Sequence, residues 1–135
     1  MASRIEFKVV MENEYRPFAN VFRDMEKANV KIEAISQSDV ADCTHFRFVA
    51  SPTNTARAVL RREGAQFSTR RVLVVRTGRH PHAVAFTKLL LGSRNVEVDY
   101  MYSGRAGDRT STLVVGVSDM ERAEHAVSGM MKTSD

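Results

Sequence analysis

The sequence predicts an α+β fold made of two tandem βαββαβ units with antiparallel sheets, the second lacking its last strand. Three observations support this prediction. Apolar and polar residues alternate in the segments expected to be strands. Apolar residues recur with helical spacing between these segments, and the same order of segments appears again in the second half of the chain.

The first half is expected to contain three strands and two helices. A strand over 5–11 alternates, and Pro17 then suits the first turn of a helix, where its missing N–H is not needed. That helix is expected to end near Asn29, and strands follow over 31–38 and around 46–50. The apolar stripe of the first helix consists of Phe18, Val21, Phe22 and Met25, and that of the second helix consists of Ala56, Val59 and Leu60. Gly64 is expected to close the second helix at its C-terminal cap.

The second half follows the same order. A strand over 72–75 leads through a loop ending in Pro81 to a helix that ends at Gly92 and whose apolar residues are Phe86, Leu89 and Leu90. The next strand alternates, with Val96, Val98, Tyr100 and Tyr102 on one face. A hairpin turn is expected at 104–107, a strand at 112–117, and a last helix from Asp119. The residues that remain leave no room for a fourth strand, so one sheet edge needs a partner.

Superposition of the two halves supports the repeat. The matched pairs are Pro17 and Pro81, Phe22 and Phe86, Val30 and Val96, Phe48 and Val115, and Ala56 and Ala123. We therefore expect one unit over 1–70 and another over 71–135. The boundary at 66–75 has no linker composition, so the last strand of the first unit is expected to continue into the first strand of the second.

The composition favours a globular protein of the cytoplasm and offers no catalytic motif. The chain has 135 residues, a net charge of +4 and one cysteine, Cys43, which excludes an internal disulfide bond. Its N-terminus has no apolar signal segment, and no apolar run approaches the ~20 residues that span a bilayer. No nucleophile, base and orienting group occur in a recognisable arrangement, so we expect no enzyme activity and no cofactor. His80 and His82 form an H-x-H pair, but no neighbouring Cys or acidic cluster completes a metal site.

Four segments give the chain a family resemblance. They are Glu14–Pro17, Val30–Ile35, Arg79–Phe86 and Asn95–Ser103. Two of them lie at equivalent places in each half of the chain. Together they resemble the ACT domain, the ferredoxin-like amino-acid-sensing module of biosynthetic enzymes. In size and plan the chain is similar to the small regulatory subunit of acetolactate synthase. The family's glycine after the helix-entry proline is replaced here by Phe18 and by His82.

The resemblance implies that a small ligand, an amino acid or a similar carboxylate, binds at the two strand-to-helix loops. Free N–H groups at a helix N-terminus attract a carboxylate, and Arg16, Arg76 and Arg79 are the expected cationic contacts. The predicted ligand-binding residues are Asn13, Arg16, Pro17, Phe18, Arg76, Gly78, Arg79, His80, Pro81 and His82. The expected partners are this ligand, a second copy of the chain in a homodimer, and a biosynthetic enzyme that the chain regulates; no membrane partner is expected.

Two alternatives stay open at this stage. RNA-recognition domains share the βαββαβ order, and His45–Val49 loosely resembles their aromatic third strand. That alternative requires Phe46 and Phe48 to face solvent, and seven arginines between 57 and 79 against the single acid Glu63 supply positive charge. We nevertheless expect nucleic acid not to be the partner. The other alternative is a degenerate ACT scaffold that binds no ligand and only dimerises.

Overall fold

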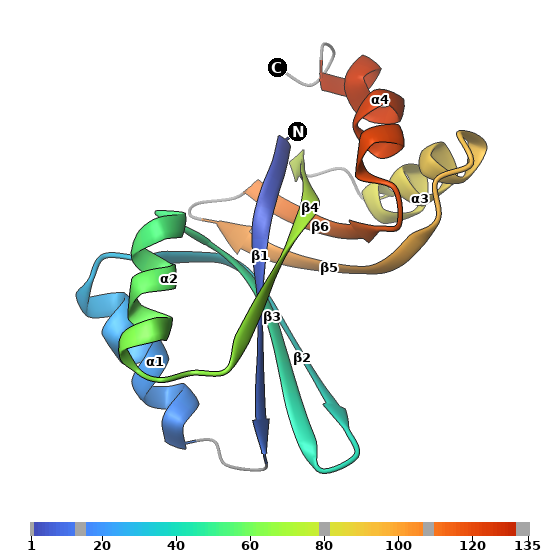
Figure 1. The fold of residues 1–135 in the computed structure, drawn as a ribbon. Coiled ribbons are helices and arrows are strands. Elements are labelled where there is room, and N and C mark those ends of the chain that lie inside the picture. The colour runs from blue at the N-terminus through green and yellow to red at the C-terminus, as the bar shows by residue number, and fades with distance from the viewer. Residues whose placement is uncertain (1, 13–15, 79–81, 107–109, 132–135) are drawn as a thin grey trace. The chain divides into compact units, whose positions relative to one another are not determined.

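A computed structural model describes residues 2–12, 16–78, 82–106 and 110–131 (Figure 1). The chain divides into two compact units. We call Ile5–Arg70 the N-terminal unit, and Arg71–Asp135 together with Met1–Arg4 the C-terminal unit. Strands β1 (Ala2–Glu12) and β4 (Phe67–Gly78) each contribute residues to both units.

The N-terminal unit has the predicted order of elements. After β1 come α1 (Arg16–Lys27), β2 (Lys31–Val40), β3 (Cys43–Ser51) and α2 (Thr53–Arg62), and the first residues of β4 complete the unit. Its strands lie in the order β2-β3-β1-β4, and β3 is antiparallel to both of its neighbours. This is the strand order of a ferredoxin-like unit, so the predicted fold class is confirmed for this half.

Aromatic residues on one face of this sheet form the core beneath α1 and α2. Phe7 on β1 and Phe48 on β3 are fully buried, and their rings stack with centroids 5.5 Å apart. Phe22 on α1 covers Phe48 edge-on at 5.9 Å. Phe46 is only 5% exposed, so neither aromatic residue of β3 can stack on a nucleic-acid base. The observation on which the RNA-binding alternative depended is therefore absent.

The C-terminal unit repeats the pattern. The remainder of β4 is followed by α3 (Ala83–Ser93), β5 (Val98–Ala106), β6 (Thr110–Val117) and α4 (Met120–Met131). The strands lie in the order β5-β6-β4, and β6 is antiparallel to both neighbours. Aliphatic side chains fill the core, the fully enclosed ones including Leu73, Leu91, Leu113, Val115 and Val127. The two-unit α+β prediction is thus confirmed.

The N-terminal end of β1 lies where the C-terminal unit needs a fourth strand. No strand follows α4 within the described residues, as predicted. Residues of β1 next to β4 belong to this unit, and Arg71 on β4 donates a hydrogen bond to Ser3 Oγ at 2.9 Å. Arg71 also forms a 2.7 Å ion pair with Glu124 on α4. The edge of β4 is therefore covered by the chain's own N-terminal strand, and not left open.

The helix ends show that the repeat is structural. Asn29 after α1 and Asn95 after α3 both adopt a φ of 60°, the left-handed conformation that asparagine tolerates. In each case the next residue, Val30 or Val96, donates a 2.9 Å hydrogen bond five residues back into the helix. Gly64 has a φ of 67° and ends α2 in the same way, which confirms its predicted capping role.

The predicted match of Phe22 with Phe86 is wrong. Equivalent helix ends at Asn29 and Asn95 place Thr87 and Leu91 of α3 where α1 has its buried Val21 and Met25. Phe86 is 51% exposed, and Leu89, which the sequence assigned to the buried stripe, is 73% exposed. Helix α3 is apolar on nearly every side, so its sequence alone does not reveal which side faces the core.

Two predictions about β5 also need correction. The register shifts between Val98 and Tyr100, because Asp99 is an extra residue in the strand. This bulge reverses the alternation, so Val98 packs against the core cluster together with Met101, and not with Tyr100 as predicted. In addition, Gly104 is not in the hairpin turn, since it pairs with Thr112 and β5 continues to Ala106. The corresponding shift in β2 falls between Ile32 and Ala34, so the bulge too is repeated.

None of the described helices is long and apolar enough to cross a membrane.

Candidate functional site

The two strand-to-helix loops predicted as ligand sites lie largely outside the described residues. Those outside are Asn13, Arg79, His80 and Pro81. Arg16, Pro17 and Phe18 form the first turn of α1, and their side chains are not described. In the C-terminal unit, Gly78 ends β4, and exposed His82 is the residue before α3. Arg76 is exposed and pairs with Thr112. The ligand-binding role of these residues remains a prediction.

A hollow of about 320 Å³ lies beside the first of these loops, in the N-terminal unit. Its walls come from the end of β1, from Val21 on α1 and from the turn that leads from α2 to β4. The lining residues are Val10, Met11, Glu12, Val21, Glu63, Gly64, Ala65 and Gln66. Among the predicted site residues whose side chains the structure describes, Arg76 and His82, neither lines it, and Glu12 directly precedes Asn13. The turn at 63–66 was read from the sequence only as a helix end, because its place beside β1 depends on the fold.

Two carboxylates lie close together at the edge of this hollow. A hydrogen bond with the side chain of Asp24 is the main cause that raises the pKa of Glu63 above its ordinary value of 4.5. Partial loss of hydration and repulsion by the Asp24 charge raise this pKa further, while Arg62 lowers it. The entrance to the hollow therefore carries unfavourable negative charge that a cationic group would relieve.

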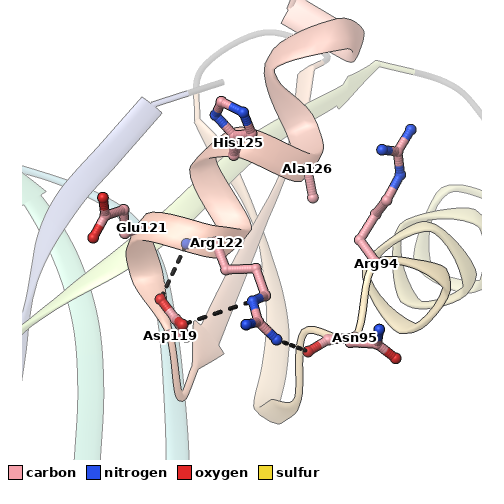
Figure 2. A pocket seen from close by; sticks show the side chains of 7 residues that line it. All are labelled: Arg94, Asn95, Asp119, Glu121, Arg122, His125 and Ala126. Atoms are coloured by element: carbon pink, nitrogen blue, oxygen red, sulfur yellow. Dashed lines mark hydrogen bonds and ion pairs between the residues drawn. The ribbon is translucent and has the colours of Figure 1, made fainter.

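The C-terminal unit contains a larger hollow, of about 590 Å³, which the sequence did not reveal (Figure 2). It lies between the turn after α3 and the first turns of α4. The lining residues are Arg94, Asn95, Asp119, Glu121, Arg122, His125 and Ala126. From the sequence, Asp119 was named only as the start of a helix, Asn95 only as the start of a strand segment, and His125 only as an isolated surface residue. The other polar residues are scattered over two segments that meet only when the sheet forms.

Asp119 and Arg122 form the fixed part of this second hollow. Asp119 accepts a 3.0 Å hydrogen bond from the Arg122 backbone N–H, which caps α4. The Arg122 guanidinium lies 3.9 Å from the Asp119 carboxylate and donates to the Asn95 carbonyl oxygen at 3.4 Å. In Figure 2 the Arg94 side chain extends from the turn after α3, and Ala126 lies between it and His125, both on α4. The hollow is therefore lined by arginines of both helices and by one histidine.

Among the residues that the structure describes, no group of three or more His, Cys, Asp or Glu side chains is placed to hold a metal ion. His80 lies outside these residues, so its pairing with His82 is not tested.

The fold is shared with solved structures of low sequence identity. A Bacteroides thetaiotaomicron protein is 20% identical, with a TM-score of 0.82 over 96% of this chain and 89% of that one. The ligand-free regulatory subunit of aspartate kinase from Thermus thermophilus is 12% identical, with a TM-score of 0.66 over 99% of this chain and 96% of the other. A C-terminal regulatory domain of aspartate kinase from Porphyromonas gingivalis is 14% identical, with a TM-score of 0.60 over 95% and 93%. At these identities the likeness shows the fold alone.

No curated protein is significantly similar to the sequence. The family model of the ACT domain pair, however, matches residues 3–131, which is nearly the whole chain. ACT domains are regulatory modules that bind small molecules, and this role agrees with the repeated units and the two hollows. The chain belongs to the ACT domain pair family.

Proposed function

We propose that this protein is a cytoplasmic, non-catalytic regulatory subunit that senses an amino acid and controls a biosynthetic enzyme. The observation that carries the proposal is the hollow of about 320 Å³ beside the strand-to-helix loop of the N-terminal unit, on an ACT framework. Its volume is at the lower end of the range of about 300–1,000 Å³ that is typical of small-molecule sites. Two aspartate kinase regulatory proteins with the same fold lend support.

The charges around this hollow suit the two ends of an amino acid. Glu12 and Glu63 line it and can accept hydrogen bonds from an ammonium group. The ligand carboxylate is assigned to Arg16 and to the N–H groups at the start of α1, where the helix dipole is positive. The corresponding contacts in the C-terminal unit are assigned to Arg76, Arg79 and the residues from Gly78 to His82.

A thermal-shift screen with the twenty amino acids tests the proposal. A ligand at 100 times its dissociation constant stabilises the folded state by about 2.7 kcal/mol, which is a shift of several degrees. We expect one amino acid to produce such a shift in the parent protein, and Glu12→Gln to weaken its binding at least tenfold in calorimetry. Glu26→Gln, an exposed acid on α1 that does not line the hollow, is the matched control and should bind normally.

Arg16→Ala and Arg23→Ala form a second matched pair on α1. Loss of binding in the first variant alone would support the carboxylate assignment. A response to no amino acid would contradict the sensing function and favour the degenerate scaffold. Equal binding by the parent and Glu12→Gln would move the ligand away from this hollow.

The homodimer remains part of the proposal, and the outer face of α3 is its best support. Phe86 and Leu89 are three residues apart, so they share one side of the helix, and they are 51% and 73% exposed, which is unusual for neighbouring large apolar side chains. Light scattering should give twice the chain mass at micromolar concentration, and Leu89→Lys should shift it toward the monomer. Lys88→Ala, which changes the exposed residue next to Leu89, is the control. A monomeric parent protein would exclude the homodimer.

A further inference from the structure

We propose that the hollow of the C-terminal unit shown in Figure 2 is a binding site for a small oxyanion, the carboxylate or phosphate group of a metabolite. This inference does not rest on the proposed amino-acid site, because the two places are at opposite ends of the unit. Gly78, from which the β4–α3 loop leaves, pairs with Ser111 at the start of β6. Asp119 follows the other end of β6, where Val117 pairs with Val98. Seven or so residues of strand, roughly 20 Å, separate the ends.

The fold brings Arg94, Arg122 and His125 together around this hollow. Within the described residues, no hydrogen bond or ion pair holds the side chain of Arg94 or of His125. The Arg122 guanidinium lies beside the hollow, where it contacts the Asp119 carboxylate at 3.9 Å and the Asn95 carbonyl oxygen at 3.4 Å while 57% of its side chain stays exposed. Guanidinium groups bind carboxylate and phosphate oxygens through paired hydrogen bonds, and the dipole of α4 adds positive potential at its first turn.

The carboxylates of Asp119 and Glu121 would repel an anion in this hollow, but their positions limit that repulsion. Asp119 is already paired with Arg122 and accepts the capping hydrogen bond of α4. Glu121 also lines the hollow, but Figure 2 shows its side chain directed away from Arg94 and toward the far side of α4. The ligand is therefore expected to contact the side of the hollow that Arg94 and Arg122 line, away from Glu121.

The N-terminal unit has the same turn and helix start but different side chains at the positions that line this hollow. The helix ends at Asn29 and Asn95 and the buried pair Ala56 and Ala123 define which positions are equivalent. At the equivalent positions of the N-terminal unit, Arg94 becomes Ala28, Asp119 becomes Pro52, Arg122 becomes Thr55 and His125 becomes Ala58. The same turn and helix start thus form without any of these charged or titratable groups. The scaffold does not require them, which supports a binding role.

A smaller side chain at one lining position also supports a binding role for the hollow. Ala126 lines the hollow, whereas the equivalent Val59 is buried in the core of the N-terminal unit. The smaller side chain leaves more space beneath Arg122 and His125. The described residues that line the N-terminal hollow do not include Ala28, Thr55 or Ala58, so that hollow lies at a different place in its unit.

The test is a titration of the ¹⁵N-labelled full chain with inorganic phosphate and, separately, with succinate. We expect amide shifts concentrated at 94–95 and 119–126, with at least tenfold weaker binding in Arg94→Ala and in His125→Ala. Alanine occupies both equivalent positions in the N-terminal unit, so these variants are expected to fold, which a melting curve confirms. Arg57→Ala on α2, whose guanidinium donates a 2.9 Å hydrogen bond to the Asn54 side chain, is the matched control.

Each result decides the matter. Tighter binding of phosphate points to a phosphorylated metabolite, and tighter binding of succinate points to a carboxylate; either supports the site when both variants lose it and Arg57→Ala does not. Absence of localised shifts with both probes up to tens of millimolar overturns the proposal. So does equal binding by the parent and Arg94→Ala. The variants Glu12→Gln and Arg16→Ala should leave this titration unchanged, which separates it from the amino-acid site.

Discussion

At the scale of single residues, glycine and asparagine occupy positions where backbone conformation or close contact decides the choice. Asn29, Asn95 and Gly64 supply the left-handed residue that ends three helices. Gly116 has a different reason, because the ring of Tyr100 on the neighbouring strand lies directly over it. Tyr100 therefore packs across the strands on a glycine.

Gly116→Ala is expected to destabilise the protein. A Cβ at this position would lie 2.6 and 2.8 Å from two carbons of the Tyr100 ring, so the ring or the strand must shift. Forced overpacking of this kind costs about 1–3 kcal/mol. Gly92→Ala is the control, because nothing lies within 4 Å of a Cβ there, and alanine in place of a helical glycine is worth up to about 1 kcal/mol. In urea denaturation, the midpoint should be lower than that of the parent for Gly116→Ala and higher for Gly92→Ala. Equal midpoints would contradict the Tyr100 contact.

The carboxyl pair of Glu63 and Asp24 predicts a pH-dependent contribution to stability. The hydrogen bond raises the pKa of Glu63, so the folded state favours its protonated form. That contribution is present below the unfolded value of 4.5 and is lost as the pH rises through the folded pKa. Glu63→Gln keeps a neutral donor at all pH values and should therefore melt at a higher temperature than the parent near neutral pH.

The advantage of Glu63→Gln should disappear as the pH falls to about 4, where the parent carboxyl is also protonated. Glu26→Gln, which removes an exposed acid elsewhere on α1, should show no such pH dependence. A constant difference between Glu63→Gln and the parent across this range would mean that the Asp24 hydrogen bond is not formed in solution.

At the scale of elements, the helices and strands are those predicted, except where the pattern of apolar residues does not show which side chains are buried. Helix α1 was predicted well because its outer face is charged and its inner face apolar. Helix α3 was assigned the wrong inner face because apolar residues surround it. In β5 the bulge at Asp99 interrupts an alternation that looks regular in the sequence, since a bulge leaves no signature in the order of apolar residues.

The corrected orientation of α3 makes a direct prediction. Leu91 is fully buried, so Leu91→Ala leaves a cavity and should cost about 2–5 kcal/mol of unfolding free energy. Leu89 is 73% exposed, so Leu89→Ala should change the stability of the monomer by less than about 0.5 kcal/mol. The comparison is made by denaturation at low protein concentration, where a dimer would dissociate. A larger loss for Leu89→Ala would restore the orientation that the sequence suggested.

At the scale of the whole molecule, the N-terminal residues belong with the C-terminal half. Deletion of 2–4 should therefore destabilise the C-terminal unit, because it removes a strand from the edge of β4 together with the Ser3 partner of Arg71. Hydrogen exchange should show faster exchange of amides in 72–75 and at the start of α4.

Arg71→Ala separates the strand from the side chain. The Arg71–Glu124 ion pair is about half exposed, with side chains 57% and 43% accessible, so its loss should cost less than about 1 kcal/mol. If Arg71→Ala accelerated exchange as much as the deletion does, the side-chain contacts and not the strand would hold this end.

The sequence by itself determined the class of fold, the order of elements, the repeat, the continuous β4 and the capping role of Gly64. These features follow from local conformational preference and from the period of apolar residues, both of which are written along the chain. The sequence also indicated the ACT relationship through four short segments. It also named ligand loops at the two strand-to-helix connections, and their role remains a prediction.

Only the tertiary structure decided which side of α3 is buried, how the bulge orients β5, what covers the edge of β4, and that Arg94, Arg122 and His125 share one hollow. Each of these depends on contacts between residues far apart in the chain. Ser3 and Arg71 form a hydrogen bond across the sheet, and Arg94 and His125 line one hollow because the turn after α3 lies beside the first turns of α4. Such contacts are set by the packing of whole elements, which no local pattern encodes.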